Sequence, residues 1–101
     1  MERAYYTYIA TNLRNTVLYT GITNNLERRI HEHAHKTTSG FTSKYKVYKL
    51  VWYQIFPTPA EAIAAEKRIK GWKRNKKINL IKDFNPGFVD LLLRDSSLRS
   101  E

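Results

Sequence analysis

The sequence predicts a single α+β domain whose elements follow the order β-β-α-β-α-α. Two stretches rich in aromatic and β-branched residues, 5–11 and 16–22, flank a short polar turn, which is typical of a β-hairpin. Apolar side chains recur at helical spacing in 26–34 and 62–72, and the apolar stretch 47–56 between them predicts a third strand. A chain of 101 residues is long enough for one hydrophobic core. We expect residues 1–94 to form the domain and the polar residues 95–101 to form a disordered tail.

The predicted hairpin places two tyrosines on the same face of the sheet. If Thr11 pairs with Thr16 across the turn, Tyr8 lies opposite Tyr19. Gly21 comes two residues later, and a glycine in a strand allows another backbone or a ligand to approach closely. The two tyrosines either stabilise the sheet as an aromatic pair or contribute two phenols to a functional site.

A helix is expected to begin directly after the hairpin. Asn24 is suited to the N-cap position, and Glu27 three residues later completes a capping box. At about 100° per residue, Arg29 and His33 lie beside the apolar stripe that begins at Leu26. Either Arg29 follows the edge of the core and a backbone carbonyl satisfies His33, or both side chains belong to a site.

The stretch that follows mixes a basic loop with an apolar strand. Residues 36–46 combine lysines and hydroxyl residues with Phe41 and Tyr45, so we expect either a plain solvated loop or a loop at the active face, where Lys44 contacts phosphate. Residues 47–56 are apolar on both faces for most of their length. This pattern favours the central strand of a covered sheet, and Pro57 ends it.

The second long helix carries a carboxylate on its buried side. Thr58, Pro59 and Glu61 mark its N-terminus. Glu66 falls inside the apolar stripe, which is formed by Ala62, Ala65, Ile69 and Trp72. A buried carboxylate costs several kcal/mol unless a cation, hydrogen bonds or a metal compensates. Glu66 is therefore either paired with Arg29 or a lysine, or a ligand of a divalent cation.

A short helix over 76–82 is expected to end before Asn85 and Pro86. Phe88, Leu91 and Leu92 then pack the end of the domain against the core.

The charge balance indicates a polyanionic partner. The chain has 18 Lys and Arg against 9 Asp and Glu, a formal net charge of +9. Nucleic acid fits this excess better than an acidic membrane surface, which requires a basic helix with an apolar face available for insertion. Residues 67–82 contain basic residues and no acidic one, so they form either an ordinary solvated surface or a platform for a phosphate backbone. With Lys44, the expected nucleic-acid-binding residues are Lys67, Lys70, Lys73, Arg74, Lys76 and Lys77.

Composition also narrows the cellular setting. Cysteine is absent, which excludes disulfides and thiolate metal sites. The N-terminal residues lack the apolar run of a signal peptide, and no stretch is long enough to span a bilayer. We expect a cytoplasmic protein with no membrane partner.

The order and spacing of the motifs resembles the GIY-YIG nuclease superfamily, in particular its small stand-alone bacterial members. The matching motifs are Tyr6-Thr7-Tyr8, Tyr19-Thr20-Gly21, Arg29 with His33, and Glu66. The first signature has Tyr and Thr where the name-giving one has Gly and Ile, and the second has Thr in place of Ile. The resemblance implies a three-stranded antiparallel sheet, a hairpin plus a central strand, flanked by helices.

The resemblance also implies a metal-dependent phosphodiesterase site. The two signature tyrosines, the arginine, the histidine and the metal-binding glutamate of the family are matched in turn, with a looser match for an asparagine near the end of the domain. The expected catalytic residues are Tyr8, Tyr19, Arg29, His33, Glu66 and Asn85. The metal bound by Glu66 is expected to be Mg²⁺, with Mn²⁺ as the alternative, and either tyrosine can activate the water.

We therefore expect a monomeric endonuclease that hydrolyses DNA rather than RNA, with weak or structure-directed specificity and a role in DNA repair or recombination. One alternative is a non-catalytic nucleic-acid-binding module on the same scaffold, whose binding depends on neither Glu66 nor Tyr19. Another is an adaptor that docks a larger protein through Trp52, Trp72 and Phe88.

Overall fold

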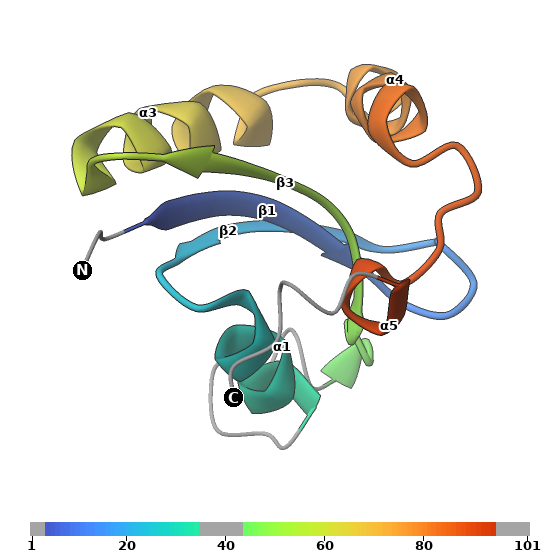
Figure 1. Cartoon of the computed structure of the whole chain (residues 1–101). Coiled ribbons are helices and arrows are strands. Elements are labelled where there is room, and N and C mark those ends of the chain that lie inside the picture. The colour runs from blue at the N-terminus through green and yellow to red at the C-terminus, as the bar shows by residue number, and fades with distance from the viewer. Residues whose placement is uncertain (1–3, 35–43, 95–101) are drawn as a thin grey trace.

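Helices cover both faces of a small antiparallel sheet in the computed structural model, which describes residues 4–34 and 44–94 (Figure 1). The strand order is β2-β1-β3. The strands are β1 (Tyr5–Thr11), β2 (Leu18–Thr23) and β3 (Lys49–Phe56), and the helices are α1 (Leu26–Ala34), α3 (Pro59–Lys70), α4 (Arg74–Phe84) and α5 (Leu91–Arg94). The predicted α+β class and element order are confirmed, and α5 adds one short helix at the end. Most of the loop predicted at 36–46, and the tail predicted at 95–101, lie outside the described residues.

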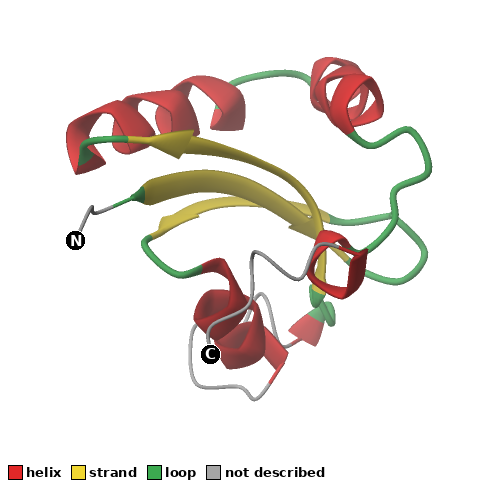
Figure 2. Ribbon diagram, viewed as in Figure 1, coloured by secondary structure: helices red, strands yellow, loops and turns green. Residues whose placement is uncertain are grey.

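Two apolar clusters hold the helices against the sheet. On one face, α1 contributes Leu26 and Ile30 and α5 contributes Leu91 and Leu92 around Tyr8 of β1. The other face packs against α3 and α4 through a separate cluster, formed by Ile9, Val51, Trp52, Ile69 and Ile81. Figure 2 shows the strands between these two sets of helices. Because side chains alternate along a strand, β1 supplies both clusters and is almost entirely buried.

The hairpin pairs two residues away from the predicted register. Thr11 lies opposite Leu18, and Tyr8 lies opposite Gly21. The predicted direct opposition of Tyr8 and Tyr19 is wrong, although both tyrosines keep the same face because a shift of two residues preserves side-chain alternation.

The connecting loop explains this shift. The side-chain oxygen of Asn12 accepts hydrogen bonds from the backbone N–H of Thr16 at 2.8 Å and of Val17 at 3.2 Å. Thr11 also donates its hydroxyl to the Val17 carbonyl at 2.7 Å. These bonds hold residues 12–17 in a longer loop than the four-residue turn that the sequence predicts.

The starts of the two long helices follow the predicted chemistry, one of them displaced. The N-cap of α1 is Asn25, whose side-chain oxygen accepts from the Arg28 N–H at 2.9 Å, so the prediction of Asn24 is wrong by one residue. The predicted start of α3 is confirmed. Thr58 accepts from the Glu61 N–H at 3.3 Å and donates its hydroxyl to the Glu61 carboxylate at 2.8 Å.

The third strand lies at an edge of the sheet, so the prediction that 47–56 forms the central strand is wrong. β1 occupies the centre. The apolar character of β3 on both faces reflects the helices that cover both sides of the sheet at this strand, with α5 on one side and α3 and α4 on the other. Hydrophobicity reports the burial of strand faces and does not report how many neighbours a strand has.

A β-bulge in this edge strand is closed by a buried asparagine. Ile9 pairs with Trp52 and the next residue pairs with Leu50, so Val51 is an extra residue in the ladder. The Asn85 amide donates to the Val51 carbonyl at 3.1 Å and to the Val89 carbonyl at 2.9 Å. Its side-chain oxygen accepts from the Val89 N–H at 3.2 Å. Asn85 thus connects the end of α4, the bulge and the segment before α5.

We predict that Asn85→Ala lowers the free energy of unfolding by about 2 kcal/mol, because it leaves buried backbone groups without partners. Urea denaturation measures this change. Asn79→Ala, at an exposed position in α4, is the matched control and should change stability by less than about 0.5 kcal/mol. Equal stability of the two variants would contradict the role assigned to Asn85.

Candidate active site

Four of the predicted catalytic side chains meet on the face of the sheet that α1 covers. Tyr8 comes from β1, Tyr19 from β2, and Arg29 and His33 from α1. The Tyr8 hydroxyl lies 3.2 Å from His33 Nε2 and accepts a hydrogen bond from Arg29 Nε at 3.4 Å. The ring centroids of Tyr8 and Tyr19 are 6.2 Å apart, and Tyr19 meets His33 edge to face at 5.2 Å.

Donor and acceptor chemistry fixes the protons in this cluster. His33 Nδ1 lies 3.3 Å from the Val47 carbonyl oxygen, which can only accept, so Nδ1 carries the hydrogen. Burial lowers the pKa of His33, and the charge of Arg29 lowers it further against the opposing hydrogen bond to Val47. The imidazole is therefore neutral at pH 7, and its Nε2 accepts the Tyr8 hydroxyl proton. His33 thus has the backbone carbonyl partner that one alternative predicted, and it also lies in the cluster of side chains that the other alternative predicted.

Tyr8 and Arg29 differ in charge and in access to water. Burial raises the pKa of Tyr8 and outweighs the hydrogen bond from Arg29, so Tyr8 is a neutral phenol with no exposed surface. Burial acts to lower the pKa of Arg29, but hydrogen bonds to Tyr8, Glu32 and Tyr19 outweigh it and raise the pKa. Arg29 is consequently a fixed cation, and Tyr19 is the only one of the two signature tyrosines with exposed surface.

Gly21 provides the space in which the two tyrosine rings lie. A Cβ atom at this position would be 2.7 Å from Tyr8 Oη and 3.0 Å from Tyr19 Cε2. The close approach at this glycine is made by the tyrosine rings of the protein itself, whereas the sequence predicted a backbone or a ligand there. The requirement is steric, because the glycine has no positive φ.

Glu66 lies on α3, which packs on the other face of the sheet from α1, and it pairs with a lysine of the same helix. Its side chain is 16% exposed, and its carboxylate lies 2.6 Å from Lys70 Nζ, one turn further along α3. The hydrogen bond to Glu66 raises the pKa of Lys70, and Tyr19 acts on it in the same direction. Glu66 is thus turned inward and paired with a lysine, which was one of the alternatives predicted for it.

Asn85 is not part of this group. Its amide is used by the backbone bonds that close the β3 bulge, on the side of the sheet that α4 covers.

Glu32 is a further member of the site, although at about 100° per residue it points away from the apolar stripe of α1. Its carboxylate accepts from Arg29 at 3.2 Å, and its side chain is 33% exposed. The i,i+3 spacing of the two residues is the sequence signal for this pair. Arg29 and Glu32 also line a hollow of about 310 Å³, together with Pro59 and Ala62 of α3.

The predicted nucleic-acid-binding residues are mostly exposed. Within the basic segment, which we define as Lys67, Lys70, Lys73, Arg74, Lys76 and Lys77, all but the half-buried Lys77 are exposed. The Lys76 ammonium lies 4.3 Å from the centre of the Trp72 ring. Lys44 is exposed beside Tyr45, with its ammonium 5.4 Å from that ring.

The donor set available for a metal is small. Across residues 4–34 and 44–94 there is no group of three or more His, Cys, Asp and Glu side chains that could hold an ion. Glu66 offers a single carboxylate, which suits Mg²⁺ because this ion commonly uses one or two carboxylates and completes its shell with waters and substrate phosphates. None of the helices in the described residues has the length and apolar character that a membrane crossing requires.

A sheet of three antiparallel strands that places two tyrosines beside a helical arginine and histidine defines a GIY-YIG type of catalytic domain. The GIY-YIG catalytic domain model matches residues 4–79, and the chain belongs to this family of nuclease domains.

Within the family, the chain is similar to the UPF0213 proteins. It is 40% identical over 76 residues to the UPF0213 protein CPE1444 of Clostridium perfringens, a match that covers 75% of this chain and 81% of the relative. It is 35% identical over 81 residues to the UPF0213 protein OB0043 of Oceanobacillus iheyensis, covering 80% and 93%. The solution NMR structure of the UPF0213 protein BH0048 from Bacillus halodurans superimposes with a TM-score of 0.55 at 28% identity, covering 87% of this chain and 93% of that one.

We predict that Gly21→Ala lowers the free energy of unfolding by about 1–3 kcal/mol, since the new methyl group overpacks the contact between Tyr8 and Tyr19. Urea denaturation and NMR shifts of the two tyrosine rings measure the effect. Gly71→Ala is the matched control, because its Cβ would be 3.5 Å from the nearest atom in a right-handed helical conformation. A Gly21→Ala variant as stable as the control, with unchanged ring shifts, would contradict the packing described.

Proposed function

We propose that the protein is a metal-dependent endonuclease that hydrolyses phosphodiester bonds in DNA. The observation that carries this proposal is the cluster in which Arg29 is hydrogen-bonded to Tyr8, with His33 on the other side of the Tyr8 hydroxyl. Glu66 pairs with Lys70 on α3, and Tyr19 acts electrostatically on Lys70. Phosphodiester hydrolysis requires a cation for the phosphate, a group that orients water and a means of neutralising the leaving oxygen. The cluster supplies candidates for the first two, and a divalent cation held by Glu66 would supply the third.

Arg29 is the phosphate-binding group in this proposal. Its guanidinium has five N–H donors in a planar fork, more than its bonds to Tyr8, Tyr19 and Glu32 require. The side chain is 28% exposed, so a phosphate oxygen can reach it. The neutral Tyr8 and His33 pair holds the guanidinium in position without contributing a competing negative charge.

Tyr19 is the phenol that orients the attacking water. Tyr8 is completely buried and bonded on both sides, whereas Tyr19 is only partly buried and lies near the cations Arg29 and Lys70. Tyr8 therefore acts as a positioning residue for Arg29.

Glu66 would hold the divalent cation, Mg²⁺ or Mn²⁺. When bound, such an ion supplies a Lewis acid for the phosphate oxygens and for the leaving oxygen. Without such an ion, Lys70 forms an ion pair with the Glu66 carboxylate. This pair offsets the free-energy cost of burying the negative charge. Because Lys70 is 53% exposed, its side chain can move into solvent when the carboxylate takes another partner.

DNA is the proposed substrate because the basic segment places several exposed cations next to the helix that carries Glu66. Contacts with the phosphate backbone carry little sequence information, which fits weak or structure-directed specificity. The proposed role of such an enzyme is DNA repair or recombination in the cytoplasm. The alternative is a binding module that keeps the scaffold without catalysis. The two proposals differ in whether Tyr19 and Glu66 are needed for cleavage, since DNA binding depends on neither residue in either of them.

We predict that the protein cleaves nicked, branched or linear DNA with Mg²⁺ or Mn²⁺, and that Tyr19→Phe and Glu66→Gln each reduce the cleavage rate by about 100-fold or more. Gel assays under single-turnover conditions measure the rate, and fluorescence anisotropy in EDTA checks that DNA affinity is retained. His31→Gln, at an exposed position on α1, is the control and should cleave like the parent. DNA binding without cleavage of any substrate by the parent would favour the binding module.

We predict that Lys70→Met tightens divalent-metal binding by about two- to fivefold, because removing an exposed ion pair removes a competitor worth up to about 1 kcal/mol. The measurement is a Mg²⁺ titration of the DNA-free protein, followed through the NMR shifts of Glu66 and its neighbours. Lys82→Met makes the same change of charge on α4 and serves as the control. An unchanged affinity for Lys70→Met, or shifts centred away from Glu66, would argue against Glu66 as the metal ligand.

A further inference from the structure

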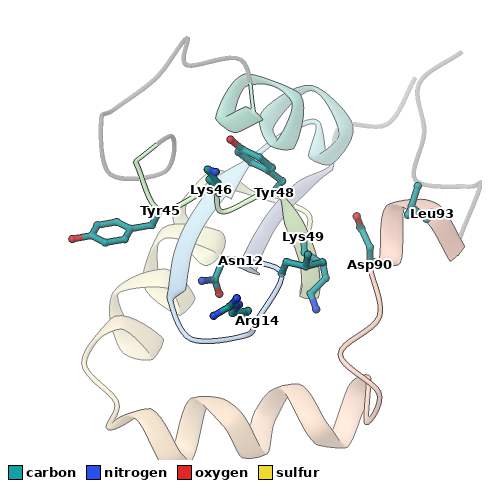
Figure 3. A pocket seen from close by; sticks show the side chains of 9 residues that line it. Asn12, Arg14, Tyr45, Lys46, Tyr48, Lys49, Asp90 and Leu93 are labelled. Atoms are coloured by element: carbon teal, nitrogen blue, oxygen red, sulfur yellow. The ribbon is translucent and has the colours of Figure 1, made fainter.

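A groove lies at the loop end of the hairpin, outside the tyrosine and arginine cluster. Its volume is about 500 Å³, and its walls come from the loop after β1, the segment before β3 and the residues around α5 (Figure 3). This volume falls in the range of about 300–1,000 Å³ that is typical of sites for small organic groups. Nothing in the proposed cleavage chemistry uses this groove.

The groove walls are largely apolar and aromatic. Tyr45 and Tyr48 line it, together with Leu13 and Leu93. Leu13 is 86% exposed and Leu93 is 75% exposed, which is a large exposure for two leucines that border one hollow. Apolar side chains gathered in this way around a concavity mark a binding surface.

The charged residues of the groove select an anion. Arg14, Lys46 and Lys49 line it, against Asp90 as its acidic residue. Figure 3 shows Lys46 and Tyr48 on one side of the groove and Arg14 on the other. A ligand that offers flat apolar faces together with negative charges satisfies both features. Nucleotides do so, because their bases stack on aromatic rings while cations bind their phosphates.

The groove is connected to both functional parts of the molecule. Val47 lies between the groove residues Lys46 and Tyr48, and its carbonyl accepts the hydrogen bond from His33. On the other side, Arg74 of the basic segment donates to the Asn15 carbonyl of the hairpin loop at 3.0 Å. The groove therefore borders the basic segment and is flanked in sequence by the backbone partner of His33.

We infer that this groove binds unpaired nucleotides of a nucleic-acid substrate. Bases in a duplex cover each other's faces by stacking, so Tyr48 and Tyr45 can stack only on bases that have left the helix or belong to a single strand. The inference rests on the proposed function in taking DNA as the substrate, and it specifies that the substrate includes a single-stranded stretch next to the bond that is cut.

The test compares single-stranded and duplex DNA binding by the full chain in EDTA. The probes are a fluorescein-labelled oligothymidylate of about eight nucleotides and a blunt duplex of equal charge. About eight nucleotides is within the usual length that a small domain contacts on a single strand. Tyr48→Ala should weaken single-strand binding about tenfold or more and change duplex binding less than about twofold. Phe84→Ala removes an exposed aromatic side chain outside the groove and is the matched control.

A second variant tests the groove without a change at Tyr48, whose side chain is partly buried. Arg14 is exposed, so Arg14→Ala leaves the core intact, and it should weaken single-strand binding more than Lys82→Ala does. Parent-like single-strand affinity of both groove variants, the result expected if the groove takes a peptide instead, would overturn the inference. An equal loss for single strand and duplex would overturn it too.

Because EDTA removes divalent metal, the binding measurement is independent of cleavage and can be judged separately from the nuclease test. Groove-dependent binding by a protein that never cleaves DNA would reject only the proposed activity, and cleavage by a protein whose groove variants bind normally would reject only the groove.

Discussion

The buried hydroxyl of Tyr8 is the contact on which the arrangement of this site depends. It receives a hydrogen bond from Arg29 and donates one to His33, whose other nitrogen donates to the Val47 carbonyl. This chain of bonds joins the central strand, α1 and the segment that leads into β3. Because every member is buried or partly buried, breaking one bond leaves a polar group that water reaches poorly, which makes the geometry stable.

The same chain of hydrogen bonds gives the two tyrosines, Tyr8 and Tyr19, different environments. Tyr8 is buried, neutral and bonded on both sides, whereas Tyr19 shares its face of the sheet but retains exposed surface. Gly21 makes this division possible, because any side chain there would collide with both rings. Hydrogen bonds hold the arginine in position and raise its pKa. Its guanidinium is charged in any case, and its carboxylate partner Glu32 is partly exposed.

Glu66 shows how a domain of this size carries a mostly buried acid. The carboxylate lies on the inner side of α3 and would be costly if left alone. Lys70, one turn away, neutralises it while remaining half in solvent. The pair therefore offsets the cost of placing a carboxylate on the inner side of the helix.

Sequence alone determined the elements, their order and the direction of the important side chains. Alternation in the strands placed Tyr8 and Tyr19 on one face, and helical spacing turned Arg29, His33 and Glu66 inward, because these directions depend only on local geometry. Tertiary structure decided the hairpin register, the edge position of β3 and the use of Asn85 at the Val51 bulge. Each of these depends on which distant or competing groups come within reach after the layers pack, and no local pattern in the chain specifies that.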